Sequence, residues 1–244
     1  NSERIYRKDH NTDVMSSFEA LKFFATAPHP CSYLEDEEAT TVFVEPTTDL
    51  SVDQIVKLAE SGFRRSGRYT YRPQCTNCTA CISVRVPVDS FNPKRRQIRT
   101  LKRNQDVSFS ARTPILDEEH YSLYKRYIET RHADGDMYPP SPSQYQSFLT
   151  SNREHAFFLE AWIDETLIAV TLFDEIPNNG LSAIYTFYEP SPQFDCRSLG
   201  RLMVLQLIEI ARGLELPFVY LGYWIRDSKK MAYKTEYRPI EMLI

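Results

Sequence analysis

The stretch RSLGRLMVLQLIEIARGLELPFVYLGYW, residues 197–224, carries the strongest structural pattern in the chain. Its first part is apolar around most of its circumference, which is typical of a helix that lies in a protein core. Its last part, PFVYLGYW, is a short uncharged run rich in β-branched and aromatic residues, which favours a buried strand. The sequence therefore predicts a long core helix followed directly by a strand.

Three strands are predicted immediately before this helix, with NNG at 178–180 as the turn between the last two. A helix over 116–132 has an acidic first turn and a basic last turn, which suits the helix dipole. A short helix follows it, and the segment after Trp224 is predicted to hold another short helix and a last strand. The predicted strands are AFFLEAWI, TLIAVTLFDEI and LSAIYTFYEP, and the short helices lie in SQYQSFLTS and SKKMAYKTEYRP.

This order of strands and helices resembles the GNAT acyltransferase fold. In that fold the helix after the third long strand begins with a backbone loop that binds the pyrophosphate of CoA. Arg197 and Gly200 fit the loop pattern, but Leu202 stands where a second small residue is expected. A large side chain there obstructs the approach of phosphate oxygens to the helix N-terminus. The sequence therefore does not favour binding of CoA.

The N-terminal part has a weaker but readable pattern. TTVFVE, around residues 41–46, and CISVRVPVDSF are predicted strands, as is VSFSAR at 107–112. DLSVDQIVKLAESGF is a predicted helix in which Ser51 caps the start, Gln54 completes a capping box and Gly62 ends it. RRQIRTLKRN is predicted to be a helix with a mostly basic surface. We expect an α+β protein with a small N-terminal cysteine-bearing domain over 1–108 and a GNAT-like domain with a mixed, mainly antiparallel sheet over 109–244.

Charge is distributed unevenly along the 244 residues. The net charge is −4, yet residues 62–103 hold eleven of the 29 Lys and Arg and only one of the 33 Asp and Glu. Such a one-signed patch attracts a polyanion, and nucleic acid is the obvious one. The alternative is a solvated basic face paired with the acidic remainder of the chain. Arg85, which alternates with Val84 and Val86, is expected to pair with a buried acid instead.

The composition is that of an ordinary globular protein, with 42% hydrophobic and 25% charged residues. No run is apolar enough to cross a bilayer, and no secretory leader is visible, so we expect a cytoplasmic location. The five cysteines do not look like a secreted disulfide framework. Cys75, Cys78 and Cys81 are spaced so that three thiolates can converge on one ion. A zinc or iron–sulfur site, reduced structural thiols and a disulfide are all left open.

Four long motifs resemble one family, the arginyl-tRNA–protein transferases, and within it the bacterial aspartate/glutamate leucyltransferases. The resemblance covers nearly the whole chain, from about Cys31 to Glu241. It implies transfer of leucine from leucyl-tRNA to the α-amino group of proteins that begin with Asp or Glu, which creates an N-degron for protein degradation. The motifs are CSYLEDEEATTVFVEP, GFRRSGRYTYRPQCTNCTACISVRVPV, KRRQIRTLKRN and YLGYWIRDSKKMAYKTEYRPIE.

The resemblance gives roles to particular residues. Lys229, Lys230 and Arg226 are expected to bind the acidic N-terminus of the acceptor protein, against the alternative of a solvated helix face. The candidate catalytic residues are Tyr223, Trp224, Tyr233, Lys234, His132 and Asp136. The candidate tRNA-binding residues are Arg64, Arg65, Arg68, Arg72, Lys94, Arg95, Arg96, Arg99, Lys102 and Arg103.

The same resemblance bears on the cysteines and on cofactors. Eukaryotic relatives carry a cysteine set associated with zinc or an iron–sulfur cluster, which makes Cys31 the candidate fourth ligand beside Cys75, Cys78 and Cys81. Leu34 stands where those relatives have a further thiol. No cofactor is required for the transfer itself, because aminoacyl-tRNA is already an activated ester.

Three alternatives are weighed against leucine transfer. Eukaryotic relatives transfer arginine, and the residues do not reveal which amino acid is carried. A CoA-dependent N-acetyltransferase would keep the second half but leaves the basic half unexplained. A non-enzymatic RNA-binding zinc module would explain the cysteines and the charge, but not the C-terminal motif.

Overall fold

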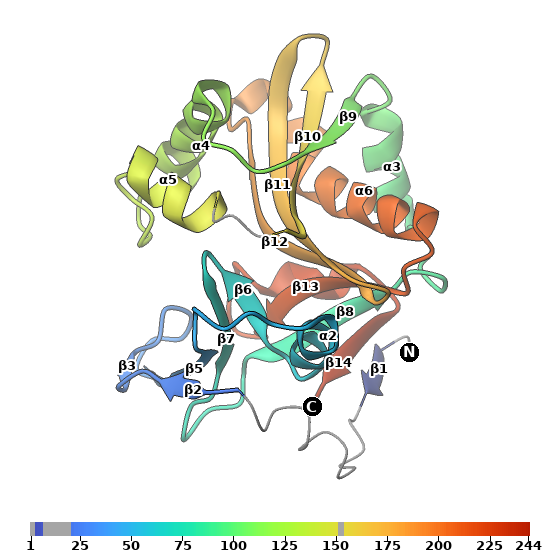
Figure 1. Cartoon of the computed structure of the whole chain (residues 1–244). Coiled ribbons are helices and arrows are strands. Elements are labelled where there is room, and N and C mark those ends of the chain that lie inside the picture. Colours follow the sequence, from blue (N-terminus) through green and yellow to red (C-terminus); the bar gives the residue numbers. More distant parts are fainter. Residues whose placement is uncertain (1–2, 7–20, 151–153) are drawn as a thin grey trace. The chain divides into compact units, whose positions relative to one another are not determined.

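The computed structural model describes residues 3–6, 21–150 and 154–244. The chain forms two compact units, drawn in Figure 1. Unit 1 comprises residues 1–91, 176–180 and 217–244, and unit 2 comprises residues 92–175 and 181–216. This division differs from the predicted boundary between residues 108 and 109. The reason is that the C-terminal strands of the chain pair with a strand of the N-terminal part, so both belong to unit 1.

Unit 1 contains a four-strand portion of sheet in the order β1–β14–β8–β13. β1 runs parallel to β14, whereas β8 is antiparallel to both β14 and β13. A second sheet has the order β2–β5–β7–β6, and β3 pairs with β4. The bounds are β1 Glu3–Tyr6, β2 Phe23–Ala25, β3 His29–Pro30, β4 Glu38–Ala39, β5 Thr41–Val44, β6 Arg64–Ser66, β7 Tyr69–Pro73, β8 Ile82–Pro87, β13 Phe218–Trp224 and β14 Ile240–Leu243.

Helix α2 (Val52–Glu60) joins the two sheets of unit 1. Its capping box forms as predicted, because Ser51 and Gln54 bond each other's backbone amides. Leu58 packs with Val44 of β5, while Ala59 packs with Tyr220 of β13. Adjacent sides of one short helix therefore bury apolar surface against different sheets.

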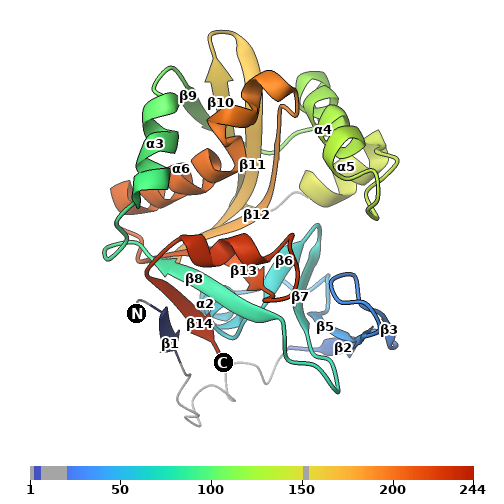
Figure 2. The same ribbon diagram turned by 180° about the vertical axis from the view of Figure 1, so that it is seen from behind.

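Unit 2 is a sheet of neighbouring strands β9, β10, β11 and β12 with helices on both faces. Figures 1 and 2 show α4 and α5 on one face and α3 and α6 on the other. Tyr124 and Ile128 of α4, Tyr145 of α5 and Phe158 of β10 belong to one core cluster. The bounds are α3 Arg95–Arg103, β9 Ser108–Arg112, α4 Glu118–Arg131, α5 Pro142–Leu149, β10 Ala156–Ile163, β11 Thr166–Ile176, β12 Gly180–Tyr188, the 3-10 helix η1 Pro192–Arg197 and α6 Leu199–Gly213.

The predicted order of elements over residues 107–224 is confirmed, from β9 through α6 to β13. The last short helix is the 3-10 helix η2 (Ala232–Glu236), and the last strand is β14. The fold is α+β with a mixed, mostly antiparallel sheet, as predicted. The strands β1, β2, β3, β4, β6 and β7 were not predicted. β2, β3, β4 and β6 have only two or three residues, which is too short to show an alternation of their own.

The prediction for Arg85 is confirmed. Its Nε donates to Glu241 Oε2 at 2.8 Å, and the guanidinium lies 3.5 Å from the centre of the Phe218 ring. The second donor, Nη1, reaches Tyr220 Oη at 3.2 Å, and Tyr220 in turn donates to Asn179. A mostly buried guanidinium is thus paired with a carboxylate and satisfied by hydrogen bonds, which is the condition for tolerating charge inside a protein.

Candidate active site and nucleic-acid interface

The segment from β13 to η2 brings seven of the predicted site residues into unit 1, and Lys234 is the most distinctive of them. Its side chain is 5% exposed, yet it carries an amine. Nζ donates to the backbone oxygen of Tyr223 and lies 3.2 Å from Met231 Sδ. The 3-10 turn of η2 therefore aims the lysine back at the end of β13.

Gly222 shapes the backbone beside this amine. The register of β13 against β8 shifts between Tyr220 and Gly222, and Gly222 has φ +77°, which favours glycine. A Cβ built on Gly222 would meet Lys234 Nζ at 3.6 Å and nothing else within 4 Å among the described residues outside its chain neighbours. A single carbon atom on Gly222 would therefore be in van der Waals contact with Nζ.

Burial changes the acidity of Lys234. Desolvation, and then the positive charge of Arg64, lowers its pKa from 10.5 to about 7, while Cys81 opposes the shift. At neutral pH a large fraction of the side chain is therefore an uncharged amine with a lone pair. This combination is unusual for lysine and marks the position as a candidate proton acceptor.

Lys234→Met is expected to remove a pH dependence of stability. Because the folded-state pKa is depressed, the cost of burying the ammonium is present below about pH 7 and disappears as pH rises toward 10.5. Wild-type stability should gain up to ~1.4 kcal/mol per pH unit relative to the variant. Urea unfolding of both proteins between about pH 7 and 8.5 measures this difference.

The unfolding measurements stop at about pH 8.5 because a second group titrates above it. Burial raises the pKa of Cys81 from 9.0 to about 11. A raised thiol pKa has the opposite effect, lowering stability above about pH 9. Equal slopes for the wild type and Lys234→Met would show that Lys234 keeps an ordinary pKa.

Tyr223 and Trp224 lie at the end of β13, and the structure corrects the prediction for Tyr223. Its hydroxyl is buried and donates to the backbone oxygen of Gly62 at 2.7 Å, with the backbone oxygen of Tyr71 a second acceptor at 3.2 Å. Burial holds its pKa well above the usual range. Tyr223 therefore fastens β13 within unit 1 and does not present its hydroxyl to a substrate. The Trp224 indole Nε1 is buried and has no hydrogen-bond partner among the described residues.

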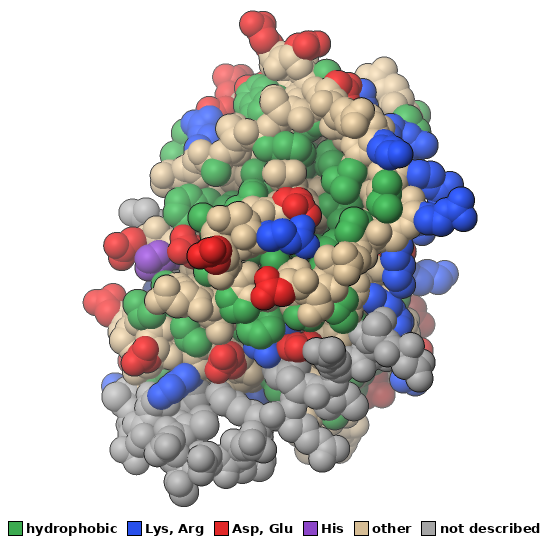
Figure 3. Space-filling view, turned by 90° about the vertical axis from the view of Figure 1, so that its right-hand side faces the viewer, with side chains coloured by type: hydrophobic (Ala, Val, Ile, Leu, Met, Phe, Trp, Pro, Cys, Tyr) green, Lys and Arg blue, Asp and Glu red, His purple; other side chains and the backbone are tan. Residues whose placement is uncertain are grey.

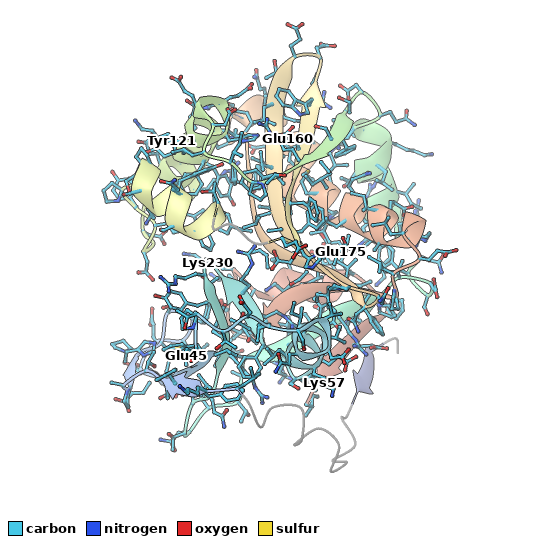
Figure 4. All side chains as sticks on the ribbon, viewed as in Figure 1. Glu45, Lys57, Tyr121, Glu160, Glu175 and Lys230 are labelled. Atoms are coloured by element: carbon cyan, nitrogen blue, oxygen red, sulfur yellow. The ribbon has the colours of Figure 1, made fainter. Side chains whose placement is uncertain are left out.

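Arg226, Lys229 and Lys230 follow β13 and are exposed, as is Tyr233. Figure 4 labels Lys230. Ser228 closes both turns that carry these cations. Its amide donates to the Ile225 backbone oxygen around Arg226, and its backbone oxygen accepts from the amides of Met231 and Ala232 after Lys229 and Lys230. Cations on a short, hydrogen-bonded turn suit the binding of a carboxylate, and their predicted role stays a prediction.

The cysteines of unit 1 are reduced. Cys31, Cys75 and Cys78 all contribute to the raised pKa of Cys81, after burial itself, so the four sulfur atoms share one neighbourhood. However, residues 3–6, 21–150 and 154–244 contain no group of three His, Cys, Asp or Glu side chains arranged to hold a metal ion. The thiols as they stand do not fit a metal site, and we derive no chemistry from one.

The structure separates the predicted tRNA-binding residues into two groups. Arg64 and Arg65 are 6% and 7% exposed, which corrects their assignment. Arg64 donates to the backbone oxygens of Ala59 and Phe63, and Arg65 donates to that of Gly67. Both guanidinium groups are therefore engaged inside unit 1. Arg68 and Arg72, in contrast, are exposed.

The other group lies on α3 of unit 2, where the predicted basic helix is confirmed. Lys94, Arg95, Arg96, Arg99, Lys102 and Arg103 are all exposed. Thr100 and Gln97 of the same helix are buried, so the cations project from the outer side of an amphipathic helix. Figure 3 shows Lys and Arg side chains gathered along one edge of the face that it displays. This surface is the best candidate for contact with nucleic acid.

His132 and Asp136 lie in unit 2, in the segment after α4. His132 is the C-cap residue of α4, and its Nε2 is 3.1 Å from the hydroxyl of Tyr127. Asp136 is exposed in a turn. Helix capping and turn formation account for both residues, and nothing in their surroundings adds support for a catalytic role.

Sequence reasoning missed Glu160, a buried carboxylate on β10 of unit 2 (Figure 4). His120 Nε2 lies 2.8 Å from its Oε1, and burial lowers the pKa of this histidine, so a neutral ring donates the bond. Ser110 and Trp162 donate to Oε2 at 2.9 and 3.1 Å. The only signal was a lone acid in the apolar strand AFFLEAWI. The network orients α4 on the sheet.

The loop before α6 is occupied by contacts within unit 2. Arg197 forms two 2.8 Å hydrogen bonds with Asp106, and Asn104 donates to the Arg197 backbone oxygen at 2.9 Å. Arg103 donates to the backbone oxygen of Cys196. Leu202, predicted to obstruct a pyrophosphate, is buried in α6. The arginine of the CoA-loop pattern is therefore engaged by a carboxylate of the same unit.

Comparison with known proteins decides the family. Residues 29–99 match the family described as arginine-tRNA-protein transferase, N terminus, and residues 119–244 match its C terminus. The chain belongs to the arginine-tRNA-protein transferase family. Proteins named aspartate/glutamate leucyltransferase from Pseudomonas putida and Pseudomonas fluorescens are 52% and 53% identical to it over 94% of this chain and 97% of theirs. One from Pseudomonas syringae is 51% identical over 94% of this chain and 96% of its own.

Solved structures add information on the fold of this family member. FemX superimposes with a TM-score of 0.51 and 8% identity, covering 91% of this chain and 85% of that chain. At this identity the likeness concerns the fold alone. Within the described part of the chain, no helix combines the length and hydropathy needed to cross a bilayer.

Proposed function

We propose that this protein transfers leucine from leucyl-tRNA to the α-amino group of proteins that begin with Asp or Glu. The observation that carries the proposal is sequence identity to proteins named aspartate/glutamate leucyltransferase. More than half of the aligned residues are identical, and the alignment spans nearly the full length of both chains. The exposed cations of α3 supply a surface for tRNA, and the β13–η2 segment supplies cations for an acidic N-terminus. The product would carry an N-degron, as the resemblance implies.

The chemistry is aminolysis of an ester. The acceptor α-amine attacks the carbonyl carbon of leucyl-tRNA, an amide bond forms, and the ester bond to the terminal ribose breaks. The nitrogen loses a proton and the ribose oxygen gains one. Because the ester is already activated, no cofactor is required.

Lys234 is our candidate for the group that accepts the proton. An α-amine has an unperturbed pKa of about 7.7–8.0, so an acceptor with a pKa of about 7 is well matched near neutral pH. Gly222 lets the backbone approach Nζ closely, because it carries no side chain beside the amine. Lys234 Nζ keeps its hydrogen bond to the Tyr223 backbone oxygen while its lone pair accepts a proton from the incoming amine.

Recognition of the acceptor is assigned to Arg226, Lys229 and Lys230. A side-chain carboxylate is best recognised by fixed cations, and these three are exposed on two successive hydrogen-bonded turns between β13 and η2. An acceptor beginning with Asn or Gln would lack the charge that these cations recognise.

A CoA-dependent acetyltransferase is the weaker candidate. Arg197, which fits the CoA-loop pattern, is held by Asp106 through two hydrogen bonds. Arginine as the transferred residue is a closer competitor, since the family description names arginine-tRNA. The two amino acids are separated by the experiment below.

In the test, tRNAs charged with labelled leucine, arginine or phenylalanine are incubated with the protein and with otherwise identical peptides. Label from leucyl-tRNA is expected on peptides that begin with Asp or Glu and not on those that begin with Asn, Gln or Ala. Labelling by arginyl-tRNA instead would replace leucine in the proposal. Acetyl transfer from acetyl-CoA, with release of the free thiol, would refute it.

A further inference from the structure

A hollow of about 270 Å³ lies where α3 meets the start of α6 in unit 2. Three of its arginines come from α3 and one from α6, and the remaining lining comes from neutral residues and one acid. The lining residues are Arg96, Arg99, Thr100, Arg103, Asp195, Cys196, Ser198 and Arg201.

Charge in this hollow is strongly one-signed. Four guanidinium groups share it with the single carboxylate of Asp195, and Arg131 of α4 also forms an ion pair with that carboxylate. Like charges that converge repel one another unless an anion lies between them. Guanidinium groups also match phosphate oxygens in geometry, because they present paired N–H donors in one plane.

The start of α6 adds to the positive potential. This helix has 15 residues and begins at Leu199. Ser198 precedes it in a left-handed conformation (φ 55°, ψ 51°), and its side chain makes no capping hydrogen bond. The helix dipole therefore presents its positive end at the hollow in addition to the four arginines.

A second hollow follows on the outer side of α3. It is lined by Arg95, Ile98, Arg99 and Lys102, so Arg99 lines both. The two sets have the same i, i+3, i+4, i+7 spacing and occupy adjacent sides of one helix. Two cationic hollows that share a residue suit a chain of successive phosphates better than a single free ion.

We propose that the hollow between α3 and α6 binds one backbone phosphate of the tRNA, held by Arg96, Arg99, Arg103 and Arg201. The neighbouring hollow takes an adjacent part of the same strand, with the exposed Ile98 against a ribose or base. This inference rests on the proposed function, and it adds α6 and Arg201 to the tRNA surface that α3 forms in unit 2. A free polyphosphate is the other source of the same chemistry.

The test measures binding of uncharged leucine tRNA to Arg201→Gln over a salt series. Loss of one phosphate contact should weaken binding several-fold and reduce the slope of log K against log salt by about 0.7–0.9. Arg99→Gln, which alters an exposed position on α3, should reduce the slope by at least as much. Arg212→Gln is the matched control, because Arg212 is an arginine of α6 at its other end, paired with Glu209.

An unchanged slope in both Arg201→Gln and Arg99→Gln would overturn the proposal. Loss of inorganic pyrophosphate binding in Arg201→Gln, with tRNA binding intact, would also overturn it and assign the hollow to a free polyphosphate. The assay involves no leucine transfer. A protein that shows the expected slopes but labels no peptide would therefore refute the proposed function and leave the phosphate site standing.

Discussion

Gly180→Ala is expected to destabilise the protein by about 3 kcal/mol or more, the range of severe backbone clashes. Gly180 is the first residue of β12, at the end of the NNG turn. A Cβ there would lie 2.3 Å from the backbone oxygen of Phe218 and 3.0 Å from its carbonyl carbon. Neither atom can move without shifting β13. The free energy of unfolding, from urea denaturation, measures the effect.

Gly213→Ala is the matched control, because it adds the same methyl group to a glycine. Gly213 ends α6, its φ is not in the left-handed region, and a Cβ there would meet nothing within 4 Å among the described residues. Alanine should stabilise this position by about 0.5–1 kcal/mol through helix propensity. If both variants unfolded at the same urea concentration, the close approach of Gly180 to β13 would be disproved.

The contrast between these glycines also shows what the sequence could not reveal. NNG predicts a turn wherever it stands, and the strands on either side followed from their own residues. The close approach to Phe218 depends on a strand 38 residues further along the chain. The grouping of β8 with β13 and β14 is likewise non-local, so a boundary drawn by sequence order near residue 108 could not reproduce the two units.

Sequence reasoning placed side chains correctly where their environment follows from a local pattern. The cations of α3 were readable because a single amphipathic helix displays them, and Arg85 because it alternates with valines in a strand. It failed for Arg64, Arg65 and Tyr223, which are all buried inside unit 1. The Tyr223 hydroxyl bonds backbone oxygens more than 150 residues away in the chain, and this contact leaves no local signal in the sequence. Lys234 appeared in the sequence as one cation among several, since only the fold surrounds its amine with apolar atoms and Arg64.

Lys234→Met is expected to lower kcat/KM for leucine transfer by about 10²–10⁴-fold, the range for loss of a positioned acid–base group. Methionine fills a similar volume but has no lone pair of comparable basicity. In the wild type, the rate should rise with pH through the lysine pKa of about 7 and again through that of the substrate amine. The variant should retain only the second rise, which a pH profile of kcat/KM measures.

Two comparisons separate proton transfer from a structural role. Lys234→Arg keeps a cation that can bond the Tyr223 backbone oxygen, but it cannot accept a proton near neutral pH and should be as inactive as Lys234→Met. Lys125→Met, at an exposed lysine of α4 paired with Glu129, should retain wild-type kinetics. Near-normal kcat/KM in Lys234→Arg would contradict proton acceptance by Lys234, because a permanently charged side chain would then support the reaction. Lys234 would in that case only stabilise the bulge at Gly222.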